Sequence, residues 1–252
     1  GNVNYRAGKL NLFGNYGINY DRRLGRGYSE QTFYPGTDST YSTTRDRDRT
    51  RSGISHAFRM GADFSLTEND IITASGLFRI SDEENIGTIV YDDFDTDGLL
   101  TRRSLRRDSE IEDEQNQEYQ LSYKRTFPGE NHELTVDFQY RDGQETESSD
   151  IVESYPLEEG STDLLQRSLN EEGDENFLVQ ADYTYPITKN KKFEAGYRGS
   201  IRQITSNYNV EEQNEQGQWE SLENFSNRFV YDENVQAGYL IFQNKMDRWG
   251  YQ

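Results

Sequence analysis

The sequence has 252 residues, a formal net charge of -19 and a mean hydropathy of -1.05. Its 18 tyrosines and 13 phenylalanines argue against disorder, because disordered segments are poor in aromatic residues. No apolar run is long enough for a transmembrane helix, and the acidic balance argues against a nucleic-acid partner. The absence of cysteine excludes disulfides and thiolate chemistry.

The predicted elements are β-strands joined by short turns of polar residues. The first turn lies at Gly8 and leads into a strand that begins at Leu10 and could stay extended to about Gly27. Similar strand pairs flank later turns, which are centred on Asn69, Gly129, Asn190 and Asp247. These centres lie about 60 residues apart, which indicates a repeat of architecture without a repeat of sequence.

The clearest strand pair runs from Gln180 to Gly199. Apolar and polar residues alternate on both sides of its turn, and the apolar set is Val179, Ala181, Tyr183, Tyr185, Phe193, Ala195 and Tyr197. Alternation places the apolar side chains on one face and the charged ones on the other. This arrangement suits a strand that has lipid on one side and a wet lumen on the other. The same pattern predicts an apolar face for the last strand at Val235, Ala237, Tyr239 and Ile241.

The predicted fold class is all-β, an antiparallel up-and-down transmembrane β-barrel in one domain that spans residues 1–252. Each repeat contains one ascending strand, one long polar loop, one descending strand and one short turn. This asymmetry between loops and turns is typical of outer-membrane barrels. Eight strands are complete, with partial strands at Asn2 to Arg6 and Gly250 to Gln252. Because a closed barrel leaves no edge unpaired, we expect a segment of a larger barrel.

Two stretches resemble a known family. Asn2 to Gly14 (NVNYRAGKLNLFG) and Tyr231 to Leu240 (YDENVQAGYL) are similar to the barrel of TonB-dependent receptor-like outer-membrane proteins. The resemblance implies a barrel of roughly 22 strands, a plug domain upstream of Gly1 and energy coupling through a TonB-type system. It also implies contact with outer-membrane lipid and uptake of an extracellular small-molecule, peptide or glycan ligand.

One loop has the beginning of a calcium-binding pattern. Asp93, Asp95 and Asp97 alternate before Gly98, and the backbone carbonyl of Leu99 could add a further oxygen ligand. The twelfth position of the pattern is Ser104, so the bidentate glutamate of an EF-hand is missing. The other interpretation is a solvated acidic loop with an Asp-Gly turn.

Four arginines alternate before the second predicted turn. Arg45, Arg47, Arg49 and Arg51 share a face with Arg59 and Asp63 if the strand stays in register as far as Leu66. They could bind an anionic substrate. The alternative is pairing with acidic neighbours on the next strands, such as Glu110, Glu112 and Glu114.

Nothing in the sequence indicates catalysis, since there is no nucleophile elbow, zinc signature or phosphate-binding loop. The acidic stretches Asp108 to Glu118 and Glu145 to Glu175 are predicted to be solvated outer loops. We therefore expect an outer-membrane receptor or transporter barrel for a nutrient. One alternative is a surface anchor or structural barrel that binds a partner protein without transport, and another is a barrel enzyme whose site would lie on the outer loops.

Overall fold

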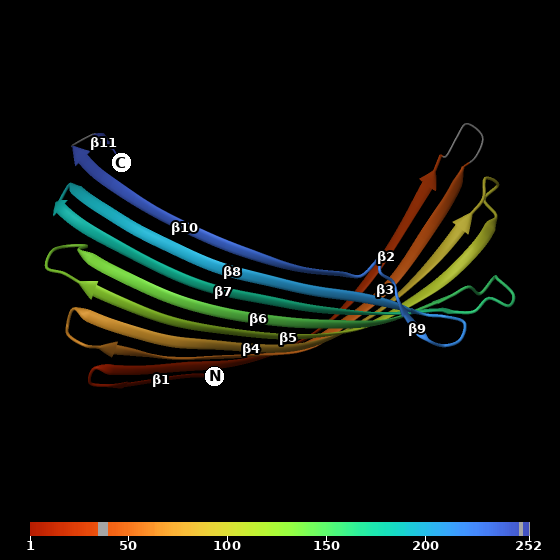
Figure 1. The fold of residues 1–252 in the computed structure, drawn as a ribbon, viewed down its shortest axis with the longest axis horizontal. Helices are drawn as coiled ribbons and strands as arrows, with labels where there is room; N and C mark the ends of the chain where they lie inside the picture. The colour runs from red at the N-terminus through yellow and green to blue at the C-terminus, as the bar shows by residue number, and fades with distance from the viewer. Residues whose placement is uncertain (35–39, 247–248, 252) are drawn as a thin grey trace.

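The computed structural model describes residues 1–34, 40–246 and 249–251 as one antiparallel sheet. Its strands are β1 (Asn2–Ala7), β2 (Leu10–Phe33), β3 (Tyr41–Ser65), β4 (Asp70–Phe94), β5 (Leu100–Thr126), β6 (Glu133–Ser154), β7 (Leu164–Thr188), β8 (Lys191–Gln213), β9 (Trp219–Ser221), β10 (Asn227–Met246) and β11 (Trp249–Tyr251). Each strand pairs with the next along the chain, except that β9 pairs only with β8 and β8 pairs onward with β10. The sheet is an open, curved layer whose short turns gather at one end (Figure 1). The described residues include no helix that is long and apolar enough to cross a membrane.

The predicted turns at Gly8, Asn69, Gly129 and Asn190 are confirmed, because each lies between two paired strands. The fifth predicted turn centre, Asp247, lies outside the described residues. Eight long strands with a short strand at each end are also as predicted. Gly8 and Gly129 have positive φ angles of 56° and 115°, a conformation that glycine adopts without strain.

The predicted long polar loops are wrong. Asp108 to Glu118 lies entirely within β5, and most of Glu145 to Glu175 belongs to β6 and β7. In the described part of the chain, the connections at that end are 95–99, 155–163 and 214–226, and the last of these contains β9. These segments form strands because their charged residues can alternate between the two faces of the sheet. A strand with water on both faces needs no apolar side chains, since its backbone hydrogen bonds to the neighbouring strands keep it paired.

The sheet has two chemically distinct faces. Residues that pair directly across strands lie on the same face, so the register defines both faces from β1 to β11. We call one the belt face; it carries Phe64, Phe78, Leu121, Phe138 and Tyr197. The other is the polar face; it carries Asp63, Arg79, Glu114, Glu145 and Arg202. The apolar alternation predicted for β2 to β8 is confirmed.

The prediction for the last strand is wrong. Val235, Ala237, Tyr239 and Ile241 pair with Ser200, Arg198, Gly196 and Glu194, and therefore lie on the polar face. Leu240 and Phe242 occupy the belt face opposite Ala195 and Phe193. Both faces of β10 are apolar here, so alternation alone does not choose between them. The polar face accommodates Tyr239 because Gly196 leaves room for its ring and Asp182 accepts its hydroxyl at 2.7 Å.

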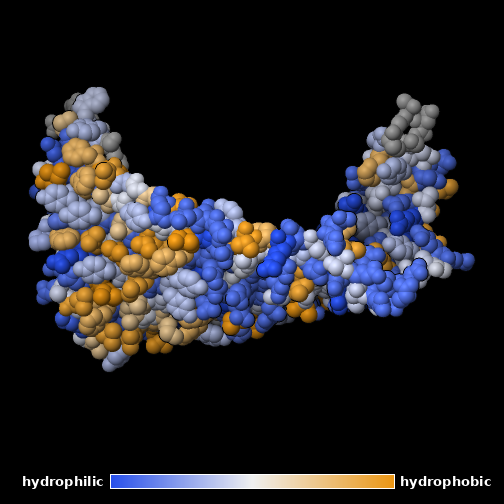
Figure 2. All heavy atoms as spheres, viewed as in Figure 1, coloured by the Kyte–Doolittle hydropathy of each residue, from blue (hydrophilic) through white to orange (hydrophobic). Residues whose placement is uncertain are grey.

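This single layer has almost no hydrophobic core. Among the described residues, Val210 is the only buried hydrophobic side chain, while large apolar residues such as Tyr5, Ile18 and Leu240 are mostly exposed. Hydrophobic residues gather over the end of the sheet that carries the short turns (Figure 2). In water, such an apolar surface would need to be covered by other parts of the protein. In a membrane it can stay on the outside of the sheet, because the lipid tails that contact it are also apolar.

Candidate functional site

The apolar belt ends at the same level on neighbouring strands. On β4 it extends from Ile72 to Ile80, close to the ~9–11 residues that a tilted strand needs to cross a bilayer. On β6, β7, β8 and β10, the upper edge of the belt is marked by four polar residues of the belt face that pair directly from strand to strand: Asp142, Glu175, Gln203 and Asp232. Because β3, β4 and β7 are each 25 residues long, more than half of each strand extends beyond the belt.

The polar face has no such belt and carries charges along the whole length of the strands. At the depth of the belt it carries Asp63, Asp137, Asp182 and Arg198. Asp63 accepts hydrogen bonds from Asn11 Nδ2 at 2.9 Å and from Thr73 Oγ1 at 2.8 Å. These groups need water or polar partners, so the candidate functional surface is the polar face.

Above the level of the belt, the polar face gathers an acidic band. The band consists of Glu83, Glu110, Glu112, Glu114, Glu145, Glu147 and Glu172. Several of these glutamates are direct cross-strand partners, in the pairs Glu83–Glu112, Glu112–Glu147, Glu114–Glu145 and Glu145–Glu172. Like charges directly opposite one another destabilise a sheet, so this placement needs protons, cations or water to offset it.

Burial and mutual repulsion disfavour the charged form of three of these carboxyls, Glu112, Glu145 and Glu147. Burial, a hydrogen bond with Glu110 and the charges of Glu110, Glu112 and Glu145 raise the pKa of Glu147 to about 7. Burial also raises the pKa of Glu112 and of Glu145, with neighbouring glutamates adding to the effect. Glu112, Glu145 and Glu147 therefore keep their protons to a higher pH than isolated glutamates do.

Arg51 enters the acidic band from β3. It forms ion pairs with Glu83 and, at 3.5 Å, with Glu112, and it donates to Asn85 Oδ1 at 3.1 Å. Asn85 is only 4% exposed and donates in turn to Glu110 at 2.5 Å. The alternative that the sequence left open for the arginines, pairing with acidic neighbours, is thus what the structure shows for Arg51.

The other predicted arginines lie farther along the same face of β3, because the register of this strand is continuous from Ser42 to Ser65. The guanidinium of Arg45 lies 5.5 Å from the centre of the Tyr91 ring. Burial raises the pKa of Asp108, and the positive charge of Arg49 offsets only part of that increase. The shared face predicted for Arg45, Arg47, Arg49 and Arg51 is confirmed, and their role in substrate binding stays a prediction.

The predicted calcium ligands lie in the β4–β5 connection. Asp95 Oδ1 accepts hydrogen bonds from the backbone N–H groups of Asp97 at 3.0 Å and Leu99 at 2.9 Å. The Leu99 carbonyl accepts one from the Asp95 N–H, and Asp93 accepts one from Thr43 Oγ1. In the described ranges, no three His, Cys, Asp or Glu side chains are grouped so that they could hold a metal ion. An Asp-Gly turn is present, with Gly98 at a φ of 74°, and calcium binding by this loop stays a prediction.

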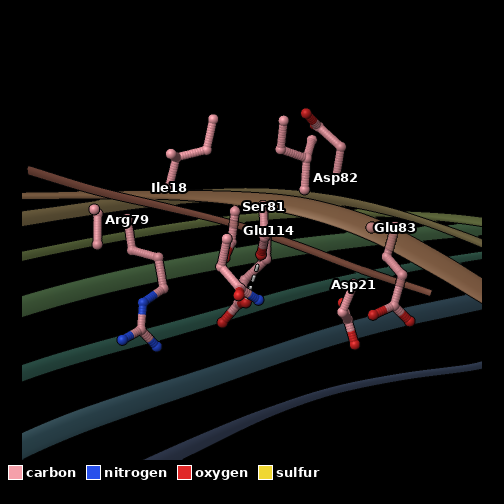
Figure 3. A pocket seen from close by; sticks show the side chains of 13 residues that line it. Ile18, Asp21, Arg79, Ser81, Asp82, Glu83 and Glu114 are labelled. Carbon is pink, nitrogen blue, oxygen red and sulfur yellow. Dashed lines mark hydrogen bonds between the residues drawn. The ribbon is translucent and has the colours of Figure 1, made fainter. Parts of the chain in front are cut away.

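A hollow lies beside the acidic band on the polar face of β2, β3, β4 and β5. Its floor is made of small residues, Gly17, Gly53, Ser55 and Ala57. Arg79, Ser81, Glu83 and Glu114 point to its side of the sheet, whereas Ile18 and Asp82 point to the other (Figure 3). The band and the hollow were missed by the sequence analysis. The signal that could have found the band is the alternation of Glu110, Glu112 and Glu114.

Comparison with known proteins gives one family match. A model of the outer membrane protein beta-barrel family matches residues 125–252. No curated protein matches the sequence.

Solved structures resemble the chain only weakly. The outer membrane protease OmpT from Escherichia coli is 11% identical, with 93% of this chain and 79% of that chain covered and a TM-score of 0.29. The ferric yersiniabactin uptake receptor FyuA from Yersinia pestis is also 11% identical, with 96% and 42% covered and a TM-score of 0.33. This chain thus spans less than half of the FyuA chain. TM-scores this low carry no inference about function.

Proposed function

Because this chain belongs to the outer membrane protein beta-barrel family, we propose that it forms part of the wall of an uptake receptor. The protein is located in the bacterial outer membrane. In this proposal the belt face contacts lipid and the polar face lines a water-filled lumen. An extracellular nutrient, either a small molecule, a peptide or a glycan, passes through that lumen or is captured in it.

The observation that carries the proposal is the charged polar face at the depth of the belt. Asp63, Asp137, Asp182 and Arg198 lie one residue away from belt residues such as Ala62 and Tyr197. A charge in hydrocarbon is costly, so these side chains require a wet compartment while their neighbours contact lipid. A lumen supplies that compartment along the full length of the strands.

Energy coupling forms the finer part of the proposal. The stretches Asn2 to Gly14 and Tyr231 to Leu240 resemble the barrels of TonB-dependent receptors. We propose that a plug domain of the full-length protein closes the lumen and links it to a TonB-type system. We also propose that the barrel acts without catalysis. The ring nitrogens of His56 and His132 bond the hydroxyls of Tyr16 and Tyr183, in line with a structural role.

The test is ion conductance of the full-length protein in planar bilayers, with and without urea at a concentration that leaves the barrel folded. Urea should release the plug and produce large openings. These openings should prefer cations, because the acidic band lies on the wall of the lumen. The combined variant Glu112→Gln, Glu145→Gln, Glu147→Gln and Glu172→Gln should lose most of that preference.

The matched control uses the opposite face of the sheet. Glu171 and Glu175 flank Glu172 on β7 but lie on the belt face. Glu171→Gln combined with Glu175→Gln should leave the cation preference unchanged. An absence of openings, or equal effects of the two sets, would contradict a lumen lined by the polar face.

A second candidate is a surface anchor that binds a partner protein without transport. It is favoured by the length of the strands, since 25 residues extend over about 80 Å while the hydrocarbon core is only about 30 Å thick. The projecting half offers a large surface outside the membrane. An anchor would give no urea-dependent conductance in the same experiment.

A further inference from the structure

We propose that the hollow on the polar face of β2–β5 binds a small zwitterionic solute of the α-amino-acid type. Arg79 would bind the carboxylate of the solute, and Glu114 would bind its ammonium group. The inference rests on the proposed function, because it requires the polar face to line a lumen that solutes can enter. It adds a substrate class to that function.

The hollow exists because the residues that form its floor are small. Gly17, Gly53, Ser55 and Ala57 lie on the polar face of β2 and β3, next to larger side chains of β4. A Cβ atom at Gly53 would lie 3.0 Å from the Asp82 carbonyl oxygen and 3.1 Å from Glu83 Cγ. Glycine at this position therefore allows the Glu83 side chain to lie against β3 and keeps the floor open.

Two of the four charged side chains on the hollow's side of the sheet are already paired. Asp21 forms an ion pair with Arg23 at 2.6 Å, and Glu83 forms one with Arg51. Within the described part of the chain, Arg79 and Glu114 form no ion pair with any residue or with each other. The hollow thus offers one cation and one anion to a ligand, which matches the two charges of a zwitterion.

Glu114 is held in place for this role. It accepts hydrogen bonds from Ser81 Oγ at 3.0 Å and from Asn116 Nδ2 at 2.5 Å. Its direct partner on β6 is Glu145 and its diagonal neighbours include Glu83 and Glu147, so the local potential favours an ammonium group. Both neutral donors fix the carboxylate without neutralising it.

Arg79 lies beside Glu114 at a suitable separation. Its direct partner on β5 is Asn116, which makes Glu114 a diagonal neighbour, and such neighbours lie about 7–8 Å apart. The second diagonal carboxylate, Glu118, lies toward the short turns and outside the hollow. Arg79 is exposed and points into the hollow, where its planar guanidinium can bind a carboxylate through two hydrogen bonds (Figure 3).

The test is a ligand-observed NMR titration of the full-length protein in detergent with three probes. L-alanine carries both charges, L-alaninamide carries only the ammonium, and N-acetyl-L-alanine carries only the carboxylate. L-alanine should bind saturably and about tenfold or more tightly than either of the others, because each of those lacks one charge-assisted contact. Arg79→Gln should lower the affinity for L-alanine to that for L-alaninamide. Glu114→Gln should lower it to that for N-acetyl-L-alanine.

Two variants serve as matched controls. Arg198→Gln and Glu153→Gln make the same changes on the polar face but outside both the hollow and the acidic band, and both should leave the affinity for L-alanine unchanged. Equal losses in the controls, or no saturable binding of L-alanine, would overturn the site. A protein that shows the urea-dependent, cation-selective openings but no alanine binding would contradict only this inference and leave the uptake barrel standing.

Discussion

Glu147 is the residue of the acidic band whose pKa is raised most clearly by its glutamate neighbours. Its direct partners are Glu112 on β5 and Asn170 on β7, and Glu110, Glu114 and Glu172 lie diagonally. The raised pKa of about 7 means that folded protein binds a proton that the unfolded chain releases near pH 4.5. Stability is therefore greatest at or below pH 4.5 as far as this group is concerned, and it falls as the pH rises toward 7.

Glu147→Gln should remove this contribution to the pH dependence, because glutamine is neutral throughout. Urea unfolding of the full-length protein should show stability that falls less between about pH 4.5 and about pH 7 in the variant than in the wild type. Glu153→Gln is the control, since Glu153 lies on the same face of β6 but outside the band. Parallel pH profiles for Glu147→Gln and the wild type would contradict the role of Glu147.

Asp95 separates the two interpretations of the β4–β5 connection. If it serves as a turn cap through Oδ1, Asp95→Asn should keep wild-type stability, because the amide oxygen can accept the same two N–H bonds. Asp95→Ala should lose about 1 kcal/mol, as other lost caps do. Unfolding with and without calcium is the measurement. Stabilisation of the wild type by calcium that is lost in Asp95→Asn would instead favour the predicted calcium site.

At the level of the elements, the central feature is a strand with lipid on one face and water on the other. Ala62 on β3 and Gln120 on β5 lie at nearly the same depth but on opposite faces of the sheet. Ala62→Arg should cost ~2–4 kcal/mol if it lies near the middle of the bilayer, whereas Gln120→Arg should cost little. Urea unfolding in lipid vesicles checks this. Small and equal effects at the two positions would argue against a lipid-facing belt.

The sequence predicted the strands well where one face is apolar and the other polar. From β2 to β8, a shift of the register by one residue would move charges such as Asp63 or Asp182 into lipid. Only one assignment of residues to the two faces is therefore compatible with the alternation. The prediction failed on β10, because both of its faces carry apolar residues such as Leu240 and Tyr239, so alternation does not show which face contacts lipid. The packing of Tyr239 over Gly196 determines the register instead. That fit is a tertiary contact and has no signature in a single strand.

At the scale of the whole molecule, the spacing of the turns was enough to predict an up-and-down sheet. The extension of the strand from Leu10 to about Gly27 was predicted, but the extension of β5 was not, because its run Asp108 to Glu118 is typical of solvated loops and here forms a ladder. The candidate site depends on the same point. The four arginines share a face because they occupy alternate positions of one strand, β3, which the sequence alone shows. The acidic band and the hollow are formed by residues of several strands, so they depend on how β2 to β7 pair.

The central claim is that this sheet crosses the outer membrane with its short turns on the periplasmic side. The most direct test is labelling of single cysteines in intact cells with a membrane-impermeant maleimide. In a full-length protein with no other cysteine, Asp97→Cys in the β4–β5 connection should be labelled at once. Asn69→Cys in the β3–β4 turn should be labelled only after the outer membrane is permeabilised. Labelling of Asn69→Cys but not of Asp97→Cys in intact cells would contradict the account.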